Sequence, residues 1–268
     1  MKLLLDLGNT RLKWALHAAG GFPEAGALAW DTPAFDDALA AAWAALPAIE
    51  SAWATTVTDA ARSTAVTAVV ADRWGCAAHW AIATAAACGV RNAYDDPAQL
   101  GTDRWLGLIA ACAEGHAPCV IAGCGTALTL DALAGDGQHL GGLIAPGPAL
   151  MRSALEAIAP RLREAGAGHV VDVATGTADA LTGGCWLAAA ALIERFSARM
   201  APRLDGTPRV LLAGGDAAHV AALLAIPSRV VADLVLRGLA VYAEAVPAGG
   251  AGGAGGAGGE RPVGPRRS

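Results

Sequence analysis

The hydrophobic and polar positions at the start of the chain predict two strands joined by a short turn. Lys2–Leu7 is almost continuously apolar, which is typical of a strand buried on both faces. After the turn at Gly8–Thr10, apolar residues alternate with polar ones from Arg11 to His17, as in a strand with one exposed face. Asp6 stands out because it places a carboxylate near the end of an otherwise apolar strand.

Helical patterns follow this unit. Ala-rich segments around Pro33–Leu46 and Thr58–Trp74 predict two helices, and Tyr94–Pro97 predicts a loop. Another helix is expected from Leu100 to about Ala113, because apolar residues recur along it at helical spacing.

The strand–turn–strand pattern then begins again. The stretch CVIAGCGTALTLDAL predicts a strand, a glycine turn and an alternating strand, and its Cys124–Ala127 aligns with Leu7–Thr10. This repeat indicates an internal duplication. We therefore expect an N-terminal domain over residues 1–116 and a C-terminal domain over 117–247.

The second half continues with alternating elements. We expect a Gly/Pro loop leading into a helix at 140–155, a loop and a helix at 175–196, and a final apolar helix over Val230–Ala245. Between them, residues 209–224 predict a strand, a Gly-Gly turn and a helix with Asp216 at its start. Residues 248–268 are of low complexity and are predicted to be disordered.

Composition narrows the class of protein. The chain has 268 residues, 54% of them hydrophobic, with a net charge of −5, so it offers no basic footprint for nucleic acid. No uninterrupted apolar run reaches the roughly 20 residues that a spanning helix needs. The N-terminal apolar run is also too short for a secretory signal. A cytoplasmic protein with no membrane partner is expected.

The six cysteines are expected to be reduced thiols. Cys112, His116, Cys119 and Cys124 have spacings that a zinc site could use. Zinc is the less favoured alternative, because Cys112 ends a predicted helix whereas Cys119 and Cys124 belong to the following strand and turn.

Three glycine turns follow predicted strands, at Gly8–Thr10, Gly123–Thr126 and Gly214–Asp216. Such a turn exposes backbone N–H groups and lets a phosphate oxygen approach closely. Each turn alone is more typical of a tight hairpin than of a phosphate loop. The sequence has neither a Walker A motif nor a dinucleotide-binding glycine fingerprint.

Taken together and in order, these turns resemble the acetate and sugar kinase, Hsp70 and actin superfamily. Within it, the motifs DLGNTRLKWAL, YDDPAQLGTDRW, GTALTLD, GGLIAPG and VLLAGGDA resemble those of type III pantothenate kinase, over roughly residues 1–245. The resemblance implies an α/β fold of two duplicated ribonuclease H-like domains, the actin-like ATPase fold, with a nucleotide cleft between them. It also implies ATP-dependent phosphorylation of pantothenate to 4′-phosphopantothenate, the first step toward coenzyme A.

The resemblance also implies roles for individual residues. Asp103 corresponds to the catalytic base, and Asp6 to the position associated with Mg²⁺. The ATP-binding residues would be Asp6, Leu7, Gly8, Asn9, Thr10, Arg11, Leu12, Lys13 and Thr126. The pantothenate-binding residues would be Tyr94, Gly101, Thr102, Asp103, Arg104 and Thr177, with Arg104 binding the substrate carboxylate.

Simpler interpretations remain open for single residues. Lys13 fits the exposed side of a hairpin strand, Asp103 a first-turn acid beside a Thr102 cap, and Arg104 a solvated helix surface. Two positions depart from the family pattern. Gly123 stands where an Asp commonly binds a monovalent cation, K⁺ or NH₄⁺, and Gly176 stands where Asn is common beside Thr177.

The resemblance further implies a homodimer with its substrate site near the interface. Two alternatives to this function stay open. One is a kinase of the same superfamily that acts on a sugar or an acid. The other is a nucleotide-binding regulatory protein without turnover.

Overall fold

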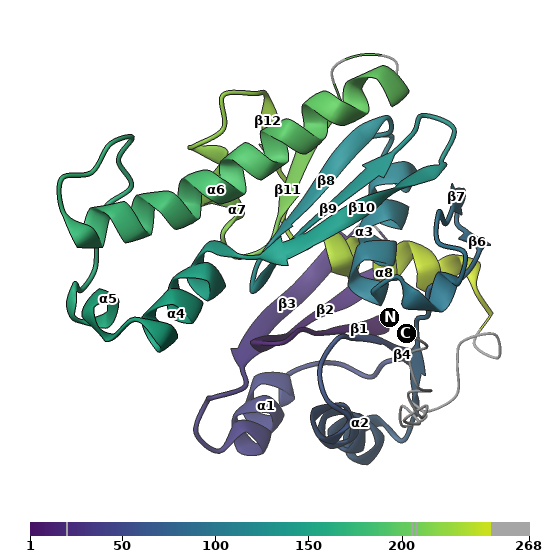
Figure 1. Ribbon diagram of the computed structural model, residues 1–268. Helices are drawn as coiled ribbons and strands as arrows, with labels where there is room; N and C mark the ends of the chain where they lie inside the picture. Colours follow the sequence, from purple (N-terminus) through teal and green to yellow (C-terminus); the bar gives the residue numbers. More distant parts are fainter. Residues whose placement is uncertain (20, 205, 207, 248–268) are drawn as a thin grey trace, which may run out of the picture.

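The computed structural model describes residues 1–19, 21–204, 206 and 208–247, and shows two five-stranded sheets of the same topology (Figure 1). The N-terminal sheet has the order β3-β2-β1-β4-β5, formed by Gly21–Ala29, Arg11–Ala18, Lys2–Leu7, Ser51–Thr56 and Ala78–Trp80. The C-terminal sheet has the order β10-β9-β8-β11-β12, formed by His139–Pro146, Ala127–Leu133, Cys119–Cys124, Arg209–Ala213 and Ser228–Val230.

The two sheets also share their strand directions. In each, the first three strands form an antiparallel meander, and the remaining two run parallel to the first strand of the unit. A shared order with shared directions is what a duplicated unit would produce, so the predicted internal duplication is confirmed. The predicted tail at 248–268 lies outside the described residues.

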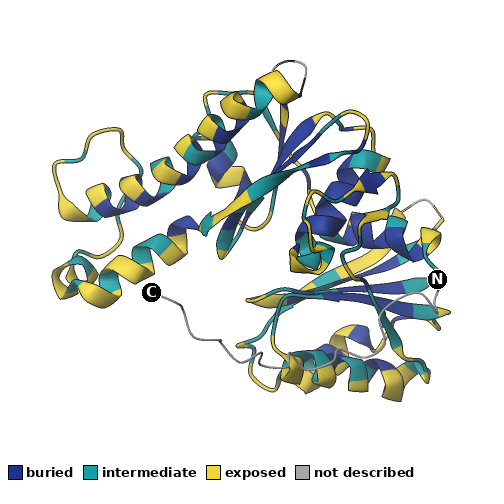
Figure 2. Ribbon diagram, turned by 45° about the vertical axis from the view of Figure 1, so that its right-hand side comes forward, coloured by how far each residue is buried: buried dark blue, intermediate teal, exposed yellow. Residues whose placement is uncertain are grey.

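Helices cover the sheets in separate layers. The outer face of the N-terminal sheet carries α1 (Phe35–Trp43) and α2 (Ala60–Trp74), whose apolar sides bury Trp43 and Val66 against the strands. The outer face of the C-terminal sheet carries α6 (Thr177–Met200) and α7 (Ala217–Ala221). Figure 2 shows that these helices are exposed on the side that faces away from the sheets.

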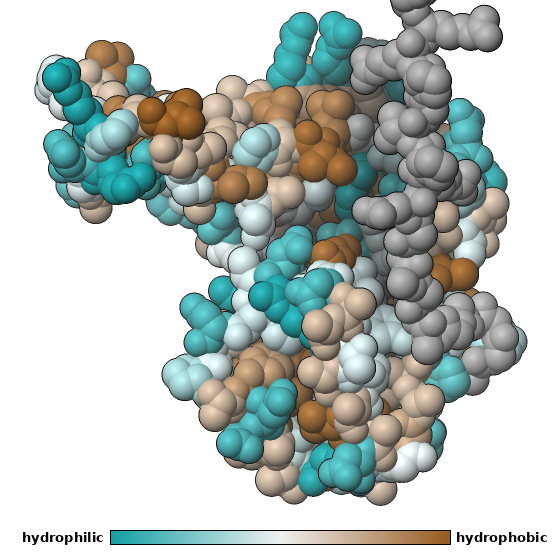
Figure 3. Space-filling view, turned by 60° about the horizontal axis from the view of Figure 1, so that its bottom comes forward, coloured by the Kyte–Doolittle hydropathy of each residue, from teal (hydrophilic) through white to brown (hydrophobic). Residues whose placement is uncertain are grey.

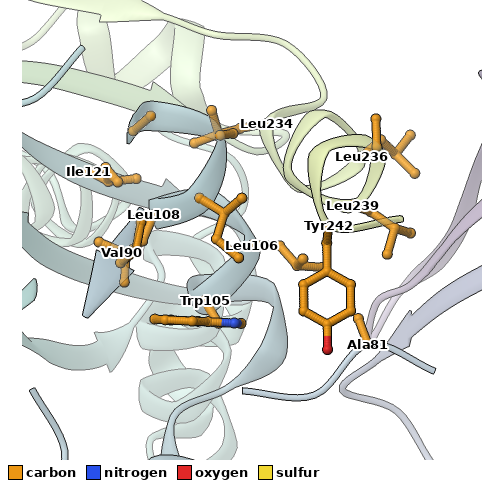
Figure 4. Close-up of a cluster of buried hydrophobic side chains, with 14 of the residues drawn as sticks. Ala81, Val90, Trp105, Leu106, Leu108, Ile121, Leu234, Leu236, Leu239 and Tyr242 are labelled. Atoms are coloured by element: carbon orange, nitrogen blue, oxygen red, sulfur yellow. The ribbon is translucent and has the colours of Figure 1, made fainter. Parts of the chain in front are cut away.

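Between the two sheets lie α3 (Thr102–Ala113) and α8 (Leu234–Ala245), which pack against each other and fill the centre (Figure 4). Their crossing is close because Gly238 has no side chain: a Cβ at this position would lie 1.9 Å from the carbonyl oxygen of Leu106. Trp105 and Tyr242 are almost fully buried there. The central pair therefore fixes the start of α3 between the two sheets.

The other elements are short or lie to one side. A hairpin of β6 (Ala86–Ala87) and β7 (Val90–Arg91) precedes α3. Single 3₁₀ turns occupy Pro97–Gln99 and Ala201–Arg203. In Figure 1, α4 (Pro148–Ile158) and α5 (Pro160–Glu164) lie with the beginning of α6 at the left, far from α3.

Several predicted boundaries need correction. In the segment 140–155 the expected loop is wrong, because residues up to Pro146 form β10, which pairs with β9, whereas the expected helix is confirmed from Pro148. Val230 ends β12, so the last helix begins only at Leu234. Strands β3 and β4 lie between helices or turns where no strand was expected. These strands gain their backbone hydrogen bonds from neighbours distant in sequence, which a local pattern does not show.

Candidate active site

The first turn leads directly from Asp6 into a tight hairpin. The Gly8 N–H donates to the Arg11 carbonyl at 3.1 Å, and the indole N–H of Trp30 donates to the Gly8 carbonyl at 2.7 Å. Arg62 donates to the Asn9 carbonyl at 3.3 Å. These three hydrogen bonds fix the backbone of the turn, while its tip remains exposed at Asn9 and Thr10. The turn is thus a shaped and accessible loop at the end of β1.

The second and third glycine turns lie against each other. In the second turn, Gly125 donates its N–H to the Ala127 carbonyl at 3.1 Å, and Thr126 is exposed. In the third, the Asp216 N–H donates to the Cys124 carbonyl at 3.1 Å. Gly214 has a φ of 106° and leaves no room for a side chain beside Cys124. The close approach of the two turns therefore requires glycine at this position.

Asp6 is in an environment that disfavours its charge. Burial raises the pKa of its carboxyl to about 7, opposed by the charge of Lys13 and reinforced by the charges of Asp103 and Asp233. Lys13 is the direct partner of Asp6 in the β1–β2 register, and its Nζ lies 3.3 Å from Asp233 Oδ1. The interpretation of Lys13 as a merely exposed hairpin residue therefore misses this ion pair.

Asp233 is a residue that the sequence interpretation missed. It precedes the first residue of α8 and has a left-handed φ of 52°. No local pattern indicates a partner for it, because Lys13 is 220 residues away in the chain.

Asp103 lies in the first turn of α3. Its Oδ1 accepts a hydrogen bond from the Arg104 backbone N–H at 2.8 Å. Burial raises the pKa of Asp103; the Arg104 N–H and guanidinium oppose this rise, and the charge of Asp131 adds to it. The alternative of a Thr102 cap is wrong: the N-cap is Gly101, and Thr102 is the first helical residue.

Arg104 is buried, so the alternative of a solvated surface arginine is wrong. Its side chain is 5% exposed and pairs with Asp131, whose side chain is 3% exposed. Arg104 Nε and Nη2 donate to the two carboxylate oxygens of Asp131 at 2.8 and 2.7 Å, and Nη1 donates to the Tyr94 hydroxyl at 3.0 Å. Burial alone would lower the pKa of Arg104, but the hydrogen bonds and charge of Asp131 raise it above its ordinary value.

The predicted residues therefore fall into two groups. The charges of Lys13 and Asp103 both act on the pKa of Asp6, and Tyr94 and Arg104, the residue after Asp103, are in direct contact with each other. Thr177 is different, because it is the exposed first residue of α6, at the end that lies with α4 and α5 in Figure 1. The fold does not bring Thr177 to Asp103 within one copy of the chain.

A hydrated Mg²⁺ fits the surroundings of Asp6. Within the described residues, no group of three or more His, Cys, Asp or Glu side chains is arranged as a metal cage. Mg²⁺ does not need one, because it keeps several waters and uses one or two carboxylates together with substrate phosphates. Asp103 and Asp233 add negative charge near Asp6, and Lys13 offsets only part of it. A bound cation would neutralise the remainder.

The position that would carry an aspartate for a monovalent cation is constrained. A Cβ at Gly123 would lie 2.5 Å from Thr129 Oγ1, so Thr129 occupies the space of the absent side chain. A carboxylate at this position does not fit unless Thr129 moves.

The cysteines are free thiols. Cys119 packs between the two sheets, whereas Cys124 packs on the α6 side of the same sheet, so the two face opposite directions. Burial raises the pKa of each to about 12. This geometry opposes a zinc site shared by these two residues, because thiolates would have to converge on one ion.

Proteins of known family resemble this chain along most of its length. A family model described as type III pantothenate kinase matches residues 2–199. A type III pantothenate kinase of Azoarcus sp. strain BH72 is 42% identical over 247 residues, covering 91% of each chain. That of Aromatoleum aromaticum is 43% identical over 243 residues, covering 91% of this chain and 98% of the relative.

Solved structures show the fold. A Sinorhizobium meliloti protein described as a 2-dehydro-3-deoxygalactonokinase superposes with a TM-score of 0.57 at 15% identity, over 91% of this chain and 98% of that one. A Campylobacter jejuni protein described as a Baf family transcriptional activator gives a TM-score of 0.56 at 21% identity, over 90% and 98%. The predicted fold class, the α/β fold of sugar kinases and actin-like ATPases, is confirmed. With the family model and the relatives in agreement, the chain belongs to the type III pantothenate kinase family.

Proposed function

We propose that the protein transfers the γ-phosphoryl group of ATP to pantothenate, giving 4′-phosphopantothenate and ADP in the first step of coenzyme A biosynthesis. Membership of the family supports this function. The observation in this chain that supports it most is that the charge of Asp103, on α3, raises the pKa of Asp6, on β1. Phosphoryl transfer requires in-line positioning and charge neutralisation more than covalent help.

Asp103 acts as the base in this proposal. The primary hydroxyl of pantothenate attacks the γ-phosphorus, the bond from phosphorus to the bridging oxygen of ADP breaks, and the hydroxyl proton passes to the Asp103 carboxylate. A raised pKa makes this carboxylate a better proton acceptor, provided that it is ionised at the working pH. Tyr94, Gly101, Thr102 and Arg104 would hold the substrate so that its hydroxyl points toward Asp103.

The glycine turns bind ATP in this proposal. Backbone N–H groups of the turn from Leu7 to Leu12 would contact the phosphates, with Lys13 and Thr126 as further contacts. Asp6 would hold Mg²⁺ through its hydration shell, and the ion supplies neutralisation of phosphate charge when bound. The nucleotide would lie between two domains, 1–116 and 117–247, whose facing surfaces are joined by α3 and α8.

A homodimer in the cytoplasm completes the proposal. Large apolar side chains are exposed on the edge strand β10, on α4 and on the segment before α6: Leu143, Ile144, Leu150, Leu155, Ile158, Val171 and Val173. Figure 3 shows apolar side chains gathered on this projecting part of the surface. Burial against a second copy would cover them and would bring its Thr177 toward a substrate site. Among the helices that the structure describes, none is long and apolar enough to cross a membrane.

Activation by K⁺ or NH₄⁺ is proposed to be weak. Gly123 supplies no carboxylate, and Thr129 occupies the space in which one would stand. Any cation in the second turn would depend on carbonyl, hydroxyl and phosphate oxygens, without a compensating protein charge.

A coupled assay of ADP release tests the function. Release is expected with pantothenate and Mg²⁺, and not with a panel of sugars and short carboxylic acids. Turnover of one of those compounds in preference to pantothenate would favour another small-molecule kinase. Binding of ATP without substrate-dependent ADP release would favour a regulatory protein.

A further inference from the structure

We propose that Asp131 and His139 are positioning residues that hold Arg104 by one edge and leave its outer edge free for the carboxylate of the substrate. This inference rests on the proposed function. Asp131 ends the motif GTALTLD, and His139 begins the stretch HLGGLIAPG. Neither residue has a role in ATP binding or in proton transfer in the proposed function.

The contacts of Arg104 divide its guanidinium into two sides. Nε and Nη2 form the side-on pair with Asp131, and Nη1 donates to Tyr94. A guanidinium has five N–H donors, so two remain after these three bonds, one on Nη1 and one on Nη2. When Tyr94 accepts the Nη1 proton on the Cδ side, these two lie on the outer edge, where a second carboxylate can be bound in the same bidentate manner.

His139 holds Asp131 in turn. His139 is fully buried, and its Nε2 lies 2.9 Å from Asp131 Oδ1. The backbone N–H of Ala93 points at Nδ1 from 3.4 Å, so Nδ1 is the acceptor and Nε2 carries the proton that is donated to Asp131. The ring also stacks on Tyr94 at 6.0 Å between centroids, with an interplanar angle of 16°. One imidazole therefore orients both contacts of Arg104.

Gly142 provides the room for this arrangement. It is the direct partner of Asp131 in the β9–β10 register. A Cβ at Gly142 would lie 2.6 Å from Arg104 Nη2, 2.6 Å from Asp131 Oδ1 and closer still to the Leu130 carbonyl. Glycine here lets the guanidinium approach the strand pair closely.

The charge balance has a consequence for specificity. Because Asp131 neutralises Arg104 locally, attraction of an anionic substrate depends on the placement of the two outer N–H groups more than on net positive charge. An error of about 1 Å in such placement can cost up to about 10²-fold in catalytic efficiency. Asp131 and His139 should therefore affect carboxylate-bearing substrates selectively.

The test compares pantothenate with pantothenol, in which an alcohol replaces the carboxylate. Asp131→Asn is expected to raise KM for pantothenate by about 10-fold or more, with the values for pantothenol and ATP changing less than about 3-fold. His139→Leu keeps the ion pair between Arg104 and Asp131, so it should raise KM for pantothenate by less. In His139→Gln the amide N–H can replace the imidazole N–H, so KM should return part of the way to the original value. Asp136→Asn is the matched control, because it breaks an exposed Asp–Arg pair on the same hairpin.

A second measurement does not depend on turnover. In ¹⁵N NMR spectra of the full chain, the Nε–H proton of Arg104 should exchange slowly with water, and faster in Asp131→Asn. Equal rises of KM for both compounds, or unchanged Nε–H exchange, would overturn the positioning role. Absence of pantothenate turnover by the unmodified protein would instead refute the proposed function, and the exchange rates would still decide how Arg104 is held.

Discussion

The charge of Asp103, in the first turn of α3, raises the pKa of Asp6 at the end of β1. Two carboxylates that influence each other in a buried place resist simultaneous ionisation. The proposed reaction needs both of them ionised, one beside Mg²⁺ and one as the base. The bound nucleotide and its cation would therefore complete a site that is electrostatically strained without them.

Replacing Asp6 by Asn is expected to stabilise the ligand-free protein at high pH. The folded pKa of about 7 lies above the ordinary value of 3.8, so the native protein loses stability as pH rises between these values and no further above them. Asn has a similar shape and does not ionise. Urea unfolding should show a gain on the order of 2 kcal/mol at pH 8 and a smaller one at pH 5.5.

The same Asp6→Asn variant should bind ATP with Mg²⁺ less tightly, which calorimetric titration can measure. Asp72→Asn, on the exposed side of α2, is the control and should change neither property. If Asp6→Asn had the same stability as the unmodified protein at both pH values and bound the nucleotide normally, the charge of Asp6 would affect neither folding nor nucleotide binding.

Asp103→Asn is expected to lower kcat by about 10² to 10⁴-fold, the usual contribution of a general base. The folded protein should persist, because the Asn side-chain oxygen can still accept the Arg104 N–H. Because the pKa of Asp103 is raised, kcat/KM of the unmodified protein should fall on acidification at a pH above the usual range of an Asp. Steady-state rates at saturating pantothenate, with Asp136→Asn as control, measure the effect. Near-native turnover of the folded variant would remove Asp103 from the mechanism.

Arg104→Lys is expected to impair recognition of pantothenate without unfolding the protein. Lysine keeps a positive charge beside the buried carboxylate of Asp131, but it lacks the planar guanidinium that binds a carboxylate through two N–H groups. KM for pantothenate should rise by about 10-fold or more, while KM for ATP and for pantothenol stays within about 3-fold. Arg91→Ala, which removes an exposed arginine, is the control.

Arg104→Ala gives a complementary result. It leaves Asp131 buried without a partner and should lower the free energy of unfolding by about 3 to 5 kcal/mol. Chemical denaturation measures this loss. If Arg104→Lys changed KM for pantothenate and pantothenol alike, Arg104 would not bind the carboxylate.

The repeat of the fold could be predicted because its central strands have strong local patterns. Lys2–Leu7 and Cys119–Cys124 are apolar runs that end in glycine turns, and the structure confirms both as strands. The edge strand β3 was not predicted, because Pro23 and Gly26 are both unusual inside a strand. Both residues suit this strand, since an edge tolerates proline and Gly26 makes room for the Trp14 ring.

The contacts of the candidate site could be anticipated from the sequence only within a contiguous motif. Asp103 and Arg104 stand in one motif on α3, whereas Asp131, the partner of Arg104, lies 27 residues away on strand β9. A signal was available: Asp131 is the only charged residue from Cys119 to Leu133. A lone acid in an apolar strand requires a partner, but the sequence does not say which cation supplies it.

Gly123 and Thr129 provide the last prediction, which concerns the monovalent cation. Because a Cβ at residue 123 would contact Thr129 Oγ1 at 2.5 Å, Gly123→Asp alone should force Thr129 into another rotamer and create little cation dependence. The double variant Gly123→Asp, Thr129→Ala removes this obstacle. It should show saturable activation by K⁺ or NH₄⁺ at concentrations about 10-fold lower than the unmodified protein requires, because an added carboxylate supplies both an oxygen ligand and charge.

Titration of KCl and NH₄Cl against choline chloride, at constant ionic strength and fixed Mg²⁺, measures the dependence. Thr129→Ala alone is the control and should leave it unchanged, since it adds space without adding charge. Tight activation of the unmodified protein that neither variant alters would contradict the role of this pair, and would place any cation away from the second turn. Weak activation that strengthens only in the double variant would mean that glycine at 123 and threonine at 129 together keep the second turn from binding the cation tightly.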